Sequence, residues 1–280
     1  MHVTAIICVR QDHQYLENCL SHLISNGVDY ALIDNGIGDE GRALLAKPSI
    51  RRHLIHYAEL PYRDRFELKA QLDKKEEVVD AIKTDWCVHL DVDEIMHSYR
   101  ESETLERAIA RLDAAGWTVI DFNEFVFLPV LHDYEMGIAG VQPMRHYYLF
   151  EPTTPRLMRA RKKSSGLSTV PRDGNMGAGG HVLFGDGLKL APESFALRHY
   201  IFRNQDHAFE KYAGRRFSEA EVQCGWHINR IGVDRAAFTL PPPHRLLALE
   251  DPRSRSLDRS KPETTHYWHW NSAASIQSCA

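Results

Sequence analysis

Short apolar runs alternate with helical patterns along the first part of the chain. Residues 3–9 are apolar and rich in β-branched side chains, which predicts a buried strand. Residues 14–26 carry apolar side chains at helical spacing, and Gly27 follows as the residue that ends the helix. Residues 29–33 form a second apolar run before the polar Asp34. This order predicts a strand, a helix and a second strand.

The alternation continues as far as residue 128. Helices are expected at residues 40–46, 66–83 and 104–115, and extended segments at 50–57, within 86–94 and at 118–128. Strands that alternate with helices favour parallel pairing, with the helices covering the sheet. The sequence therefore predicts an α/β fold with a mainly parallel central sheet and helices on both of its faces.

The character of the sequence changes near Pro129. Residues 129–196 are rich in Pro, Gly, His and Arg, and the stretch 171–181 holds too much glycine for a regular helix or strand. A helical pattern returns at 206–216, whereas the last 40 residues contain three consecutive prolines and end in polar residues. We expect a single domain with an α/β half at 1–128, a half with long loops and a C-terminal helix at 129–240, and a peripheral tail at 241–280.

The composition is that of a globular protein and excludes several classes. Charged residues make up 26% and hydrophobic residues 43% of the 280 positions. A net charge of −4 argues against a nucleic-acid-binding protein that relies on bulk positive charge, although residues 156–163 form a local basic patch. No run of about 18 apolar residues occurs, so no transmembrane helix is expected. Peripheral contact with a membrane stays open.

Cysteine usage favours a reducing compartment. The chain has five cysteines, an odd number, and none of them forms a C-x-x-C pair or shows zinc-ligand spacing. Cys8 and Cys87 lie inside apolar runs and are expected to be buried free thiols. The chain also begins with a strand-like run rather than with a signal-peptide pattern. A cytoplasmic location is therefore expected.

Polar residues follow three of the predicted strands. Arg10 follows the first strand, Asp34 follows the second, and Asp91, Asp93 and Glu94 close a later apolar run. Ligands of parallel sheets bind at the carboxyl ends of the strands. On an extended strand, Asp91 and Asp93 would point to the same face, where a divalent cation would offset their repulsion. The alternative is that these carboxylates sit in a solvated turn or at a helix N-terminus.

The order of these motifs resembles that of family 2-like glycosyltransferases with the GT-A fold. Asp91-Val92-Asp93-Glu94 is similar to the Asp-x-Asp motif of the family, which is followed by Glu, and residues 3–127 follow the family's order of strands and polar breaks. Residues 197–216 resemble a His-Tyr…Lys segment of one branch, whose bacterial members are placed near polysaccharide or glycoconjugate synthesis. Gln11-Asp12 stands where the family usually has Asn-Glu, and the Ser-x-Asp-Gly turn is reduced at residues 38–41.

The resemblance implies a metal-dependent glycosyltransferase. It would move a sugar from a nucleotide sugar, with a UDP-sugar favoured, to a glycan or lipid-linked acceptor. Mn²⁺ or Mg²⁺ would neutralise the charge that develops on the diphosphate leaving group. Asp93 is expected to ligate this metal, with Asp91 as a second ligand or facing the ribose or a metal-bound water. Asp34 is expected to contact the base or ribose, or only to form a turn, and Arg10 to contact the diphosphate or fix its loop.

Three residues farther along the chain have two interpretations each. His199 would complete the metal site or clamp the diphosphate, or it is a satisfied core histidine. Lys211 would contact the diphosphate, or it belongs to a solvated helix face. His181, which follows two glycines, would lie near the transferred sugar, or it is a loop residue without a role in binding.

A general base is needed for the acceptor hydroxyl if the sugar is transferred in one displacement, which inverts the anomeric carbon. The candidates are acidic residues after the Asp-x-Asp motif, namely Glu124, Asp133, Asp173 and Asp186. Glu124 belongs to a predicted strand and is therefore held by a rigid element. Asp173 lies in the glycine-rich stretch, which could close on the donor, and it is slightly favoured.

Two other functions are compatible with the same pattern. A sugar-phosphate nucleotidyltransferase would share the sheet and the acidic metal site. Such enzymes usually have a loop rich in glycine and basic residues after the first strand, however, and residues 8–12 contain no glycine. A non-catalytic glycan-binding protein on the same fold would bind carbohydrate without turning over any nucleotide sugar.

Overall fold

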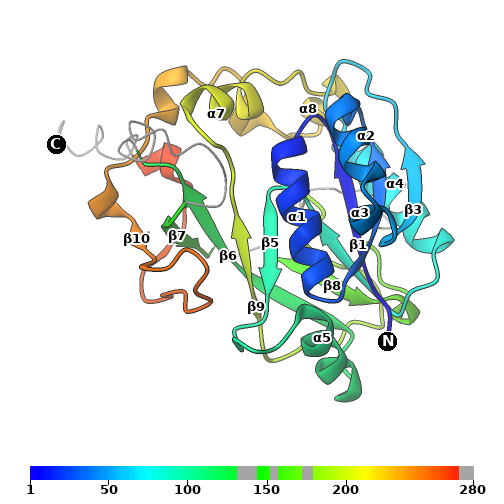
Figure 1. The fold of residues 1–280 in the computed structure, drawn as a ribbon. Helices are drawn as coiled ribbons and strands as arrows, with labels where there is room; N and C mark the ends of the chain where they lie inside the picture. The colour runs from blue at the N-terminus through cyan, green and yellow to red at the C-terminus, as the bar shows by residue number, and fades with distance from the viewer. Residues whose placement is uncertain (131–143, 152–156, 172–178, 271–280) are drawn as a thin grey trace. The chain divides into compact units, whose positions relative to one another are not determined.

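The structure is a computed structural model that describes residues 1–130, 144–151, 157–171 and 179–270 (Figure 1). The chain divides into two compact units. Unit 1 comprises residues 1–123 and 155–197, and unit 2 comprises residues 124–154 and 198–280. The chain therefore leaves unit 1 after residue 123 and returns to it at residue 155. The boundaries expected from the sequence do not include this return.

A mainly parallel sheet forms the centre of unit 1. Its strand order is β3 (Leu54–Glu59), β2 (Asp29–Asp34), β1 (Val3–Val9), β4 (Trp86–Leu90), β8 (Met158–Lys162) and the start of β6 (Val119–Leu128). The first four strands pair in parallel, whereas β8 pairs antiparallel with both β4 and β6. The α/β class with a mainly parallel central sheet is therefore confirmed.

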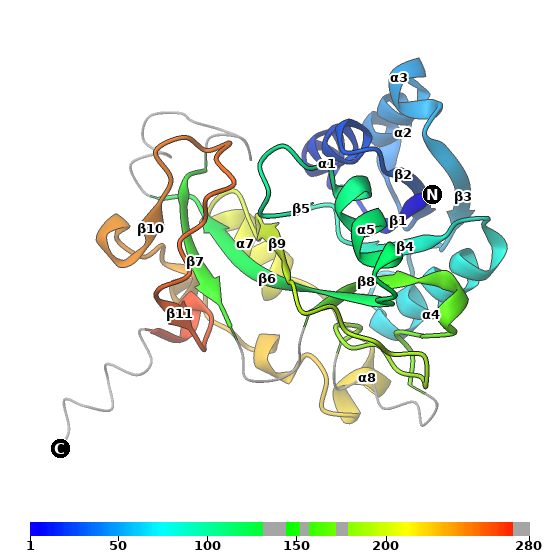
Figure 2. The ribbon, with the colours of Figure 1, turned by 90° about the horizontal axis from the view of Figure 1, so that it is seen from below.

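Helices cover both faces of this sheet, as Figure 2 shows for α1 and α4. The helices of unit 1 are α1 (His13–Ser25), α2 (Gly38–Ala46), α3 (Pro48–Arg51), α4 (Leu68–Ala81) and α5 (Leu105–Ala114). Val78 on α4 packs with Ile6 and Cys87, which point to one face of the sheet. Trp86 points to the other face, because successive strand residues alternate, and its ring N–H donates to Asp113 on α5 at 2.9 Å.

Several elements differ from those expected from the sequence. Proline fits the first position of a helix, so Pro48 begins α3, and the following strand begins at Leu54 rather than at residue 50. Strands β5 (Glu94–His97), β8 and β9 (Phe195–His199) have no counterpart among the expected elements. These strands are short and contain charged or polar residues, so they lack the longer apolar run that marks a buried strand.

Strand β8 carries two buried arginines, Arg159 and Arg161. Arg159 pairs with Glu94 at 2.8 Å, and Arg161 pairs with Glu76 of α4 at 2.6 Å. A buried charge needs such a partner, because leaving water is costly for an unpaired ion. The basic patch expected at residues 156–163 is therefore wrong at these two positions, where the arginines join β8 to acidic residues of the same unit.

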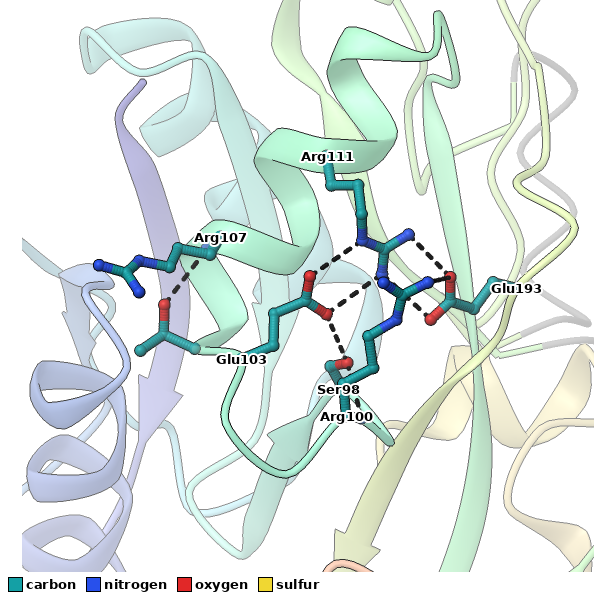
Figure 3. Close-up of polar contacts among 7 residues, drawn as sticks. Ser98, Arg100, Glu103, Arg107, Arg111 and Glu193 are labelled. Carbon is teal, nitrogen blue, oxygen red and sulfur yellow. Dashed lines mark hydrogen bonds and ion pairs between the residues drawn. The ribbon is translucent and has the colours of Figure 1, made fainter.

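Arg111 on α5 connects three segments of unit 1 (Figure 3). Its guanidinium donates to both carboxylate oxygens of Glu103, at 2.9 and 3.1 Å, and to both carboxylate oxygens of Glu193, at 2.8 and 3.1 Å. Ser98 donates a further hydrogen bond to Glu103 at 2.8 Å. Arg107 lies one turn earlier on the same helix and contributes its backbone N–H to the side chain that caps the helix.

Unit 2 is built on the remainder of β6 and on β7 (His146–Phe150), which pair antiparallel. The short strands β10 (Leu247–Ala248) and β11 (Pro262–Glu263) also pair with β7. Among its described residues, the α-helices of this unit are α7 (Gln205–Tyr212) and α8 (Glu219–Gln223). Within the residues that the structure describes, no helix has both the length and the apolar character needed to cross a membrane.

The core of unit 2 is largely aromatic. Tyr148, Phe202 and Phe238 are buried together with Tyr267 and Trp270. The last two residues come from the segment that the sequence analysis assigned to a peripheral tail. That assignment is wrong for the described part of the segment, because its aromatic side chains fill the core of the unit.

Candidate functional site

The loops that follow β1, β2 and β3 are hydrogen-bonded to one another. The backbone N–H of Gln11 donates to Gly36 at 3.1 Å, and that of Asn35 donates to Val9 at 2.9 Å. The side-chain amide of Asn35 also donates to the carbonyl of Leu60 at 2.6 Å. We call these loops, residues 10–12, 34–37 and 60–62, the rim. The rim is fixed at the carboxyl ends of parallel strands, where sheets of this class bind ligands.

Asp34 holds the rim together with its carboxylate. One oxygen accepts the backbone N–H groups of Gly36 and Ile37, at 2.7 and 2.8 Å, and the other accepts the Tyr57 hydroxyl at 2.5 Å. The guanidinium of Arg42 lies 3.6 Å from the second oxygen. Burial would raise the pKa of Asp34, but these hydrogen bonds and Arg42 outweigh it and lower the pKa. The geometry agrees with the turn-forming interpretation, and a nucleotide contact by Asp34 stays a prediction.

The rim and the edge strand β3 carry two exposed tyrosines and one arginine. Tyr57 is 41% exposed and Tyr62 is 36% exposed. The guanidinium of Arg10 lies 3.9 Å from the centre of the Tyr62 ring. Gly36 has a positive φ of 107°, which side-chain-bearing residues rarely adopt, and a Cβ atom there would be in ordinary contact with the Arg10 side chain at 3.4 Å. Arg10 was expected at this edge from the sequence, whereas the two tyrosines were not, because their only signal was a position near the end of a strand.

The Asp-x-Asp segment forms a tight turn between β4 and β5. The backbone N–H of Glu94 donates to the carbonyl of Asp91 at 3.0 Å, and the N–H of Asp91 donates to the Glu94 carboxylate at 3.0 Å. Asp91 and Asp93 therefore do not lie on one extended strand, and the alternation that would place them on the same face does not apply. Asp93 and Glu94 are buried, whereas the Asp91 side chain is 49% exposed.

Lys75 reaches this turn from α4. Its ammonium group lies 2.7 Å from His89 Nε2 and 3.1 Å from Asp91 Oδ1. The side chain of Lys75 is only 5% exposed, so this lysine is buried rather than solvated. Burial and the nearby cations Lys75 and Arg159 hold the pKa of His89 well below its usual range, so the neutral ring accepts the ammonium hydrogen. Burial would raise the pKa of Asp91, but Lys75 and Arg159 outweigh it and lower that pKa.

A divalent metal fits only part of this turn. Among the described residues, no group of three or more His, Cys, Asp or Glu side chains is arranged to hold a metal ion. Asp91 Oδ1 already pairs with Lys75, so a metal ion would share this carboxylate with an ammonium group, and ligation by Asp91 stays a prediction. Asp93 fits by residue type and by its place after β4. Mg²⁺ and Mn²⁺ need only one or two protein carboxylates when phosphate and water supply the other ligands.

Unit 2 brings two predicted residues together. His199 Nδ1 lies 2.6 Å from Glu124 Oε1, so the proposed metal ligand and one of the proposed bases form a pair. Both side chains are mostly buried. Lys211 is not a fully solvated residue, because its ammonium group donates a hydrogen bond to the carbonyl of Ile201 at 2.8 Å. This hydrogen bond ties α7 to the strand end before it. A contact of Lys211 with the diphosphate stays a prediction.

The remaining candidates are His181, Asp186 and two residues outside the described part of the chain. The carbonyl of His181 accepts the backbone N–H of Met158 at 2.8 Å, which makes His181 part of the support for β8. Asp186 is exposed in a loop of unit 1. Asp133 and Asp173 lie outside the described residues, so their roles stay predictions.

Comparisons with known proteins add distant likenesses only. No family model and no curated protein matches the chain. Among solved structures, the chain is similar to S. aureus TarS 1-349 in complex with UDP, with 11% identity over 85% of this chain and 68% of that one, at a TM-score of 0.46. It is also similar to the mannosyltransferase PcManGT from Pyrobaculum calidifontis in complex with GDP-Man and Mn²⁺, with 13% identity over 76% of this chain and 63% of that one, at 0.42.

A longer TarS structure is matched with 10% identity over 85% of this chain, at a TM-score of 0.46, and the chain spans 41% of its length. Likenesses at these identities and TM-scores establish neither a shared activity nor a shared substrate. The function proposed below therefore depends on the side chains of unit 1 and unit 2.

Proposed function

We propose that the chain is a glycosyltransferase of GT-A type that uses a nucleotide sugar as its donor, with a UDP-sugar favoured. The observation that supports this most is the line of strand ends in unit 1. The adjacent parallel strands β3, β2, β1 and β4 end in the rim and in the Asp91–Glu94 turn. One edge of the sheet thus offers aromatic rings, an arginine and carboxylates, which are the groups needed for a base, a diphosphate and a cation.

The nucleoside end of the donor is assigned to the rim. Exposed aromatic rings bind bases by stacking, and Tyr62 is both exposed and oriented by its contact with Arg10. Tyr57 lies on β3, the strand that precedes Tyr62, and is fixed by its hydrogen bond to Asp34. In this proposal Asp34 acts mainly by holding Tyr57 and the loop after β2 in place, and the guanidinium of Arg10 also faces the diphosphate.

The diphosphate end is assigned to the turn after β4. Asp93 would hold Mn²⁺ or Mg²⁺ there, together with donor phosphate oxygens and water. When bound, such an ion neutralises the negative charge that develops on the departing diphosphate. Asp91 would contact a hydroxyl group of the donor. Arg159 keeps Glu94 paired and buried, so the turn itself stays rigid while the donor binds.

The chemical step needs a group that removes the acceptor proton. The acceptor oxygen attacks the anomeric carbon, the nucleoside diphosphate leaves with the bonding electrons, and the proton passes to the base. We assign this role to Glu124, whose orientation is set by His199 at 2.6 Å. Asp173 remains the second candidate. The acceptor would be a glycan or a lipid-linked sugar of a polysaccharide pathway, and a single displacement inverts the anomeric carbon.

Donor hydrolysis tests the proposal in its simplest form. A panel of UDP- and GDP-sugars with Mn²⁺ should include at least one donor that releases its nucleoside diphosphate slowly without an acceptor. Release of pyrophosphate from a nucleoside triphosphate and a sugar phosphate would instead identify a nucleotidyltransferase. Binding of glycans without turnover of any donor would identify a carbohydrate-binding protein.

A further inference from the structure

Lys75 occupies a position in α4 that the helical pattern would give to an apolar residue. It lies on the buried stripe of the helix with Leu72, Val78 and Val79. Lysine is almost never fully buried unless its charge is paired. The side chain of Lys75 is 5% exposed, whereas those of Lys69 and Asp73, which pair with each other on the same helix, are about half exposed. The burial of Lys75 therefore points to a specific partner.

The partners of Lys75 are all on or directly after β4. An ammonium group has three hydrogens to donate, and three acceptors lie within reach: His89 Nε2 at 2.7 Å, Asp91 Oδ1 at 3.1 Å and the carbonyl of Leu90 at 3.4 Å. A cavity of about 20 Å³ borders Lys75, His89 and Arg159. It has room for about one water molecule, and the ammonium group is engaged with its three acceptors.

Two carboxylates of the turn, Asp91 and Glu94, each lie beside a buried cation. Lys75 neutralises Asp91, and Arg159 neutralises Glu94. A divalent cation that used Asp91 as a ligand would lie close to the Lys75 ammonium, and two cations at such short distance repel each other. Repulsion by Arg159 likewise disfavours a metal ion bound by Glu94. The pairing with Lys75 therefore disfavours Asp91 as a metal ligand.

We propose that Lys75 is a positioning residue of the donor site. Its ammonium group holds Asp91 so that this carboxylate binds a hydroxyl group of the nucleotide sugar and does not coordinate the metal ion. This inference rests on the proposed function. The Asp91 side chain is half exposed, and its Oδ1 oxygen is fixed by Lys75. A carboxylate fixed in this way accepts a hydroxyl hydrogen without first having to order its own side chain.

The test measures UDP affinity and Mn²⁺ affinity separately. Calorimetry gives the UDP dissociation constant at saturating Mn²⁺, and electron paramagnetic resonance of free Mn²⁺ gives the metal concentration at half-saturation with UDP present. The variants are Asp91→Asn, Lys75→Met and Asp93→Asn. The matched control is Lys69→Met, which removes an exposed lysine from the same helix. Asp91→Asn keeps the shape of the side chain and so tests the inference even where Lys75→Met fails to fold.

The expected result separates the two affinities. Asp91→Asn and Lys75→Met should weaken UDP binding by at least about tenfold and leave the Mn²⁺ half-saturation within about twofold of that of the unmodified protein, because they affect a hydrogen bond to a charged group and no metal ligand. Asp93→Asn should weaken Mn²⁺ binding at least about tenfold. Lys69→Met should change neither value.

Two results would overturn the inference while leaving the proposed function intact. One is a shift of the Mn²⁺ half-saturation by Asp91→Asn as large as that by Asp93→Asn, which would make Asp91 a metal ligand. The other is an unchanged UDP affinity in both Asp91→Asn and Lys75→Met. Failure of the unmodified protein to bind UDP or GDP with Mn²⁺ would instead overturn the proposed function, and this inference with it.

Discussion

The guanidinium of Arg10 lies 3.9 Å from the centre of the Tyr62 ring, so the loop after β1 and the loop after β3 are joined by a stacked pair. Tyr62 is more than one-third exposed, and one face of its ring is covered by Arg10. A base can therefore stack on this platform without first ordering it. The pair would link the base and the diphosphate of one donor molecule.

Tyr62→Ala should weaken UDP binding by about 1–3 kcal/mol, a loss of roughly five- to 150-fold, because the stacking surface is removed. Tyr62→Phe keeps the ring and should bind UDP almost normally. Ile55→Ala, which truncates an exposed side chain on β3, is the control for a general effect on this edge of the sheet. Equal UDP affinity in Tyr62→Ala and the unmodified protein would place the base elsewhere.

The Arg111 network makes a prediction about stability that does not depend on any ligand. Arg111→Met removes four hydrogen bonds to Glu103 and Glu193 and should lower the free energy of unfolding by about 1–2 kcal/mol, since the pairs are only partly shielded from water. Arg107→Met on the same helix should change it by less than about 0.5 kcal/mol, because the contact described for Arg107 uses its backbone. Urea denaturation of both variants would measure the difference.

The same network predicts a dependence on pH. Hydrogen bonds from Arg111 and Ser98 hold the pKa of Glu103 below its ordinary value of 4.5, although partial burial acts the other way. Because the pKa is lower in the folded state, the stabilisation is fully present above about pH 4.5 and is lost as the pH falls through the folded value. The stability difference between the unmodified protein and Glu103→Gln should shrink on acidification. A difference that grows toward low pH would contradict this account.

Glu124→Gln tests the assignment of the base. It should lower kcat by roughly 10²- to 10⁴-fold, because the amide cannot take the acceptor proton. The UDP affinity should stay unchanged, since the groups assigned to the donor all belong to unit 1. Steady-state kinetics with an active donor and calorimetry with UDP would give the two values. An unchanged kcat would transfer the role to Asp173, which Asp173→Asn would then test.

Local pattern was enough to predict the first elements of the fold. The first strand has the expected bounds, Val3–Val9, and helix α1 differs from its expected range by one residue at each end. Gly27 adopts a positive φ of 74°, as expected for the residue that ends this helix. Cys87 is a buried free thiol, as its apolar surroundings indicate. Each of these features depends on residues that are close together in the sequence.

Buried charges could not be predicted in this way. Lys75, Arg159 and Arg161 are charged residues in ordinary amphipathic or polar stretches, and such residues are usually at the surface. Each of them is buried because a carboxylate from a distant segment lies beside it: Asp91, Glu94 and Glu76, respectively. The pairing arises only when α4, β4 and β8 come together in the fold, so no local sequence pattern predicts it.

The candidate site was predictable in its location and only partly in its residues. Parallel sheets bind ligands at the carboxyl ends of their strands, and this rule places Arg10, Asp34 and the Asp-x-Asp motif at one edge from their positions in the sequence alone. The exposure of Tyr57 and Tyr62 is a property of the folded chain. The same holds for the pairing of Glu124 with His199, two residues that are far apart in the sequence.

Nucleotide binding tests the central claim most directly, and it needs no knowledge of the acceptor. UDP and GDP are titrated into the unmodified protein and into Asp93→Ala by calorimetry, each with and without Mn²⁺. The account predicts that at least one nucleotide binds the unmodified protein, that Mn²⁺ strengthens this binding, and that Asp93→Ala abolishes the Mn²⁺-dependent part. Absence of binding by both nucleotides with Mn²⁺ present, or equal binding by Asp93→Ala, would contradict a donor site at this edge of the sheet.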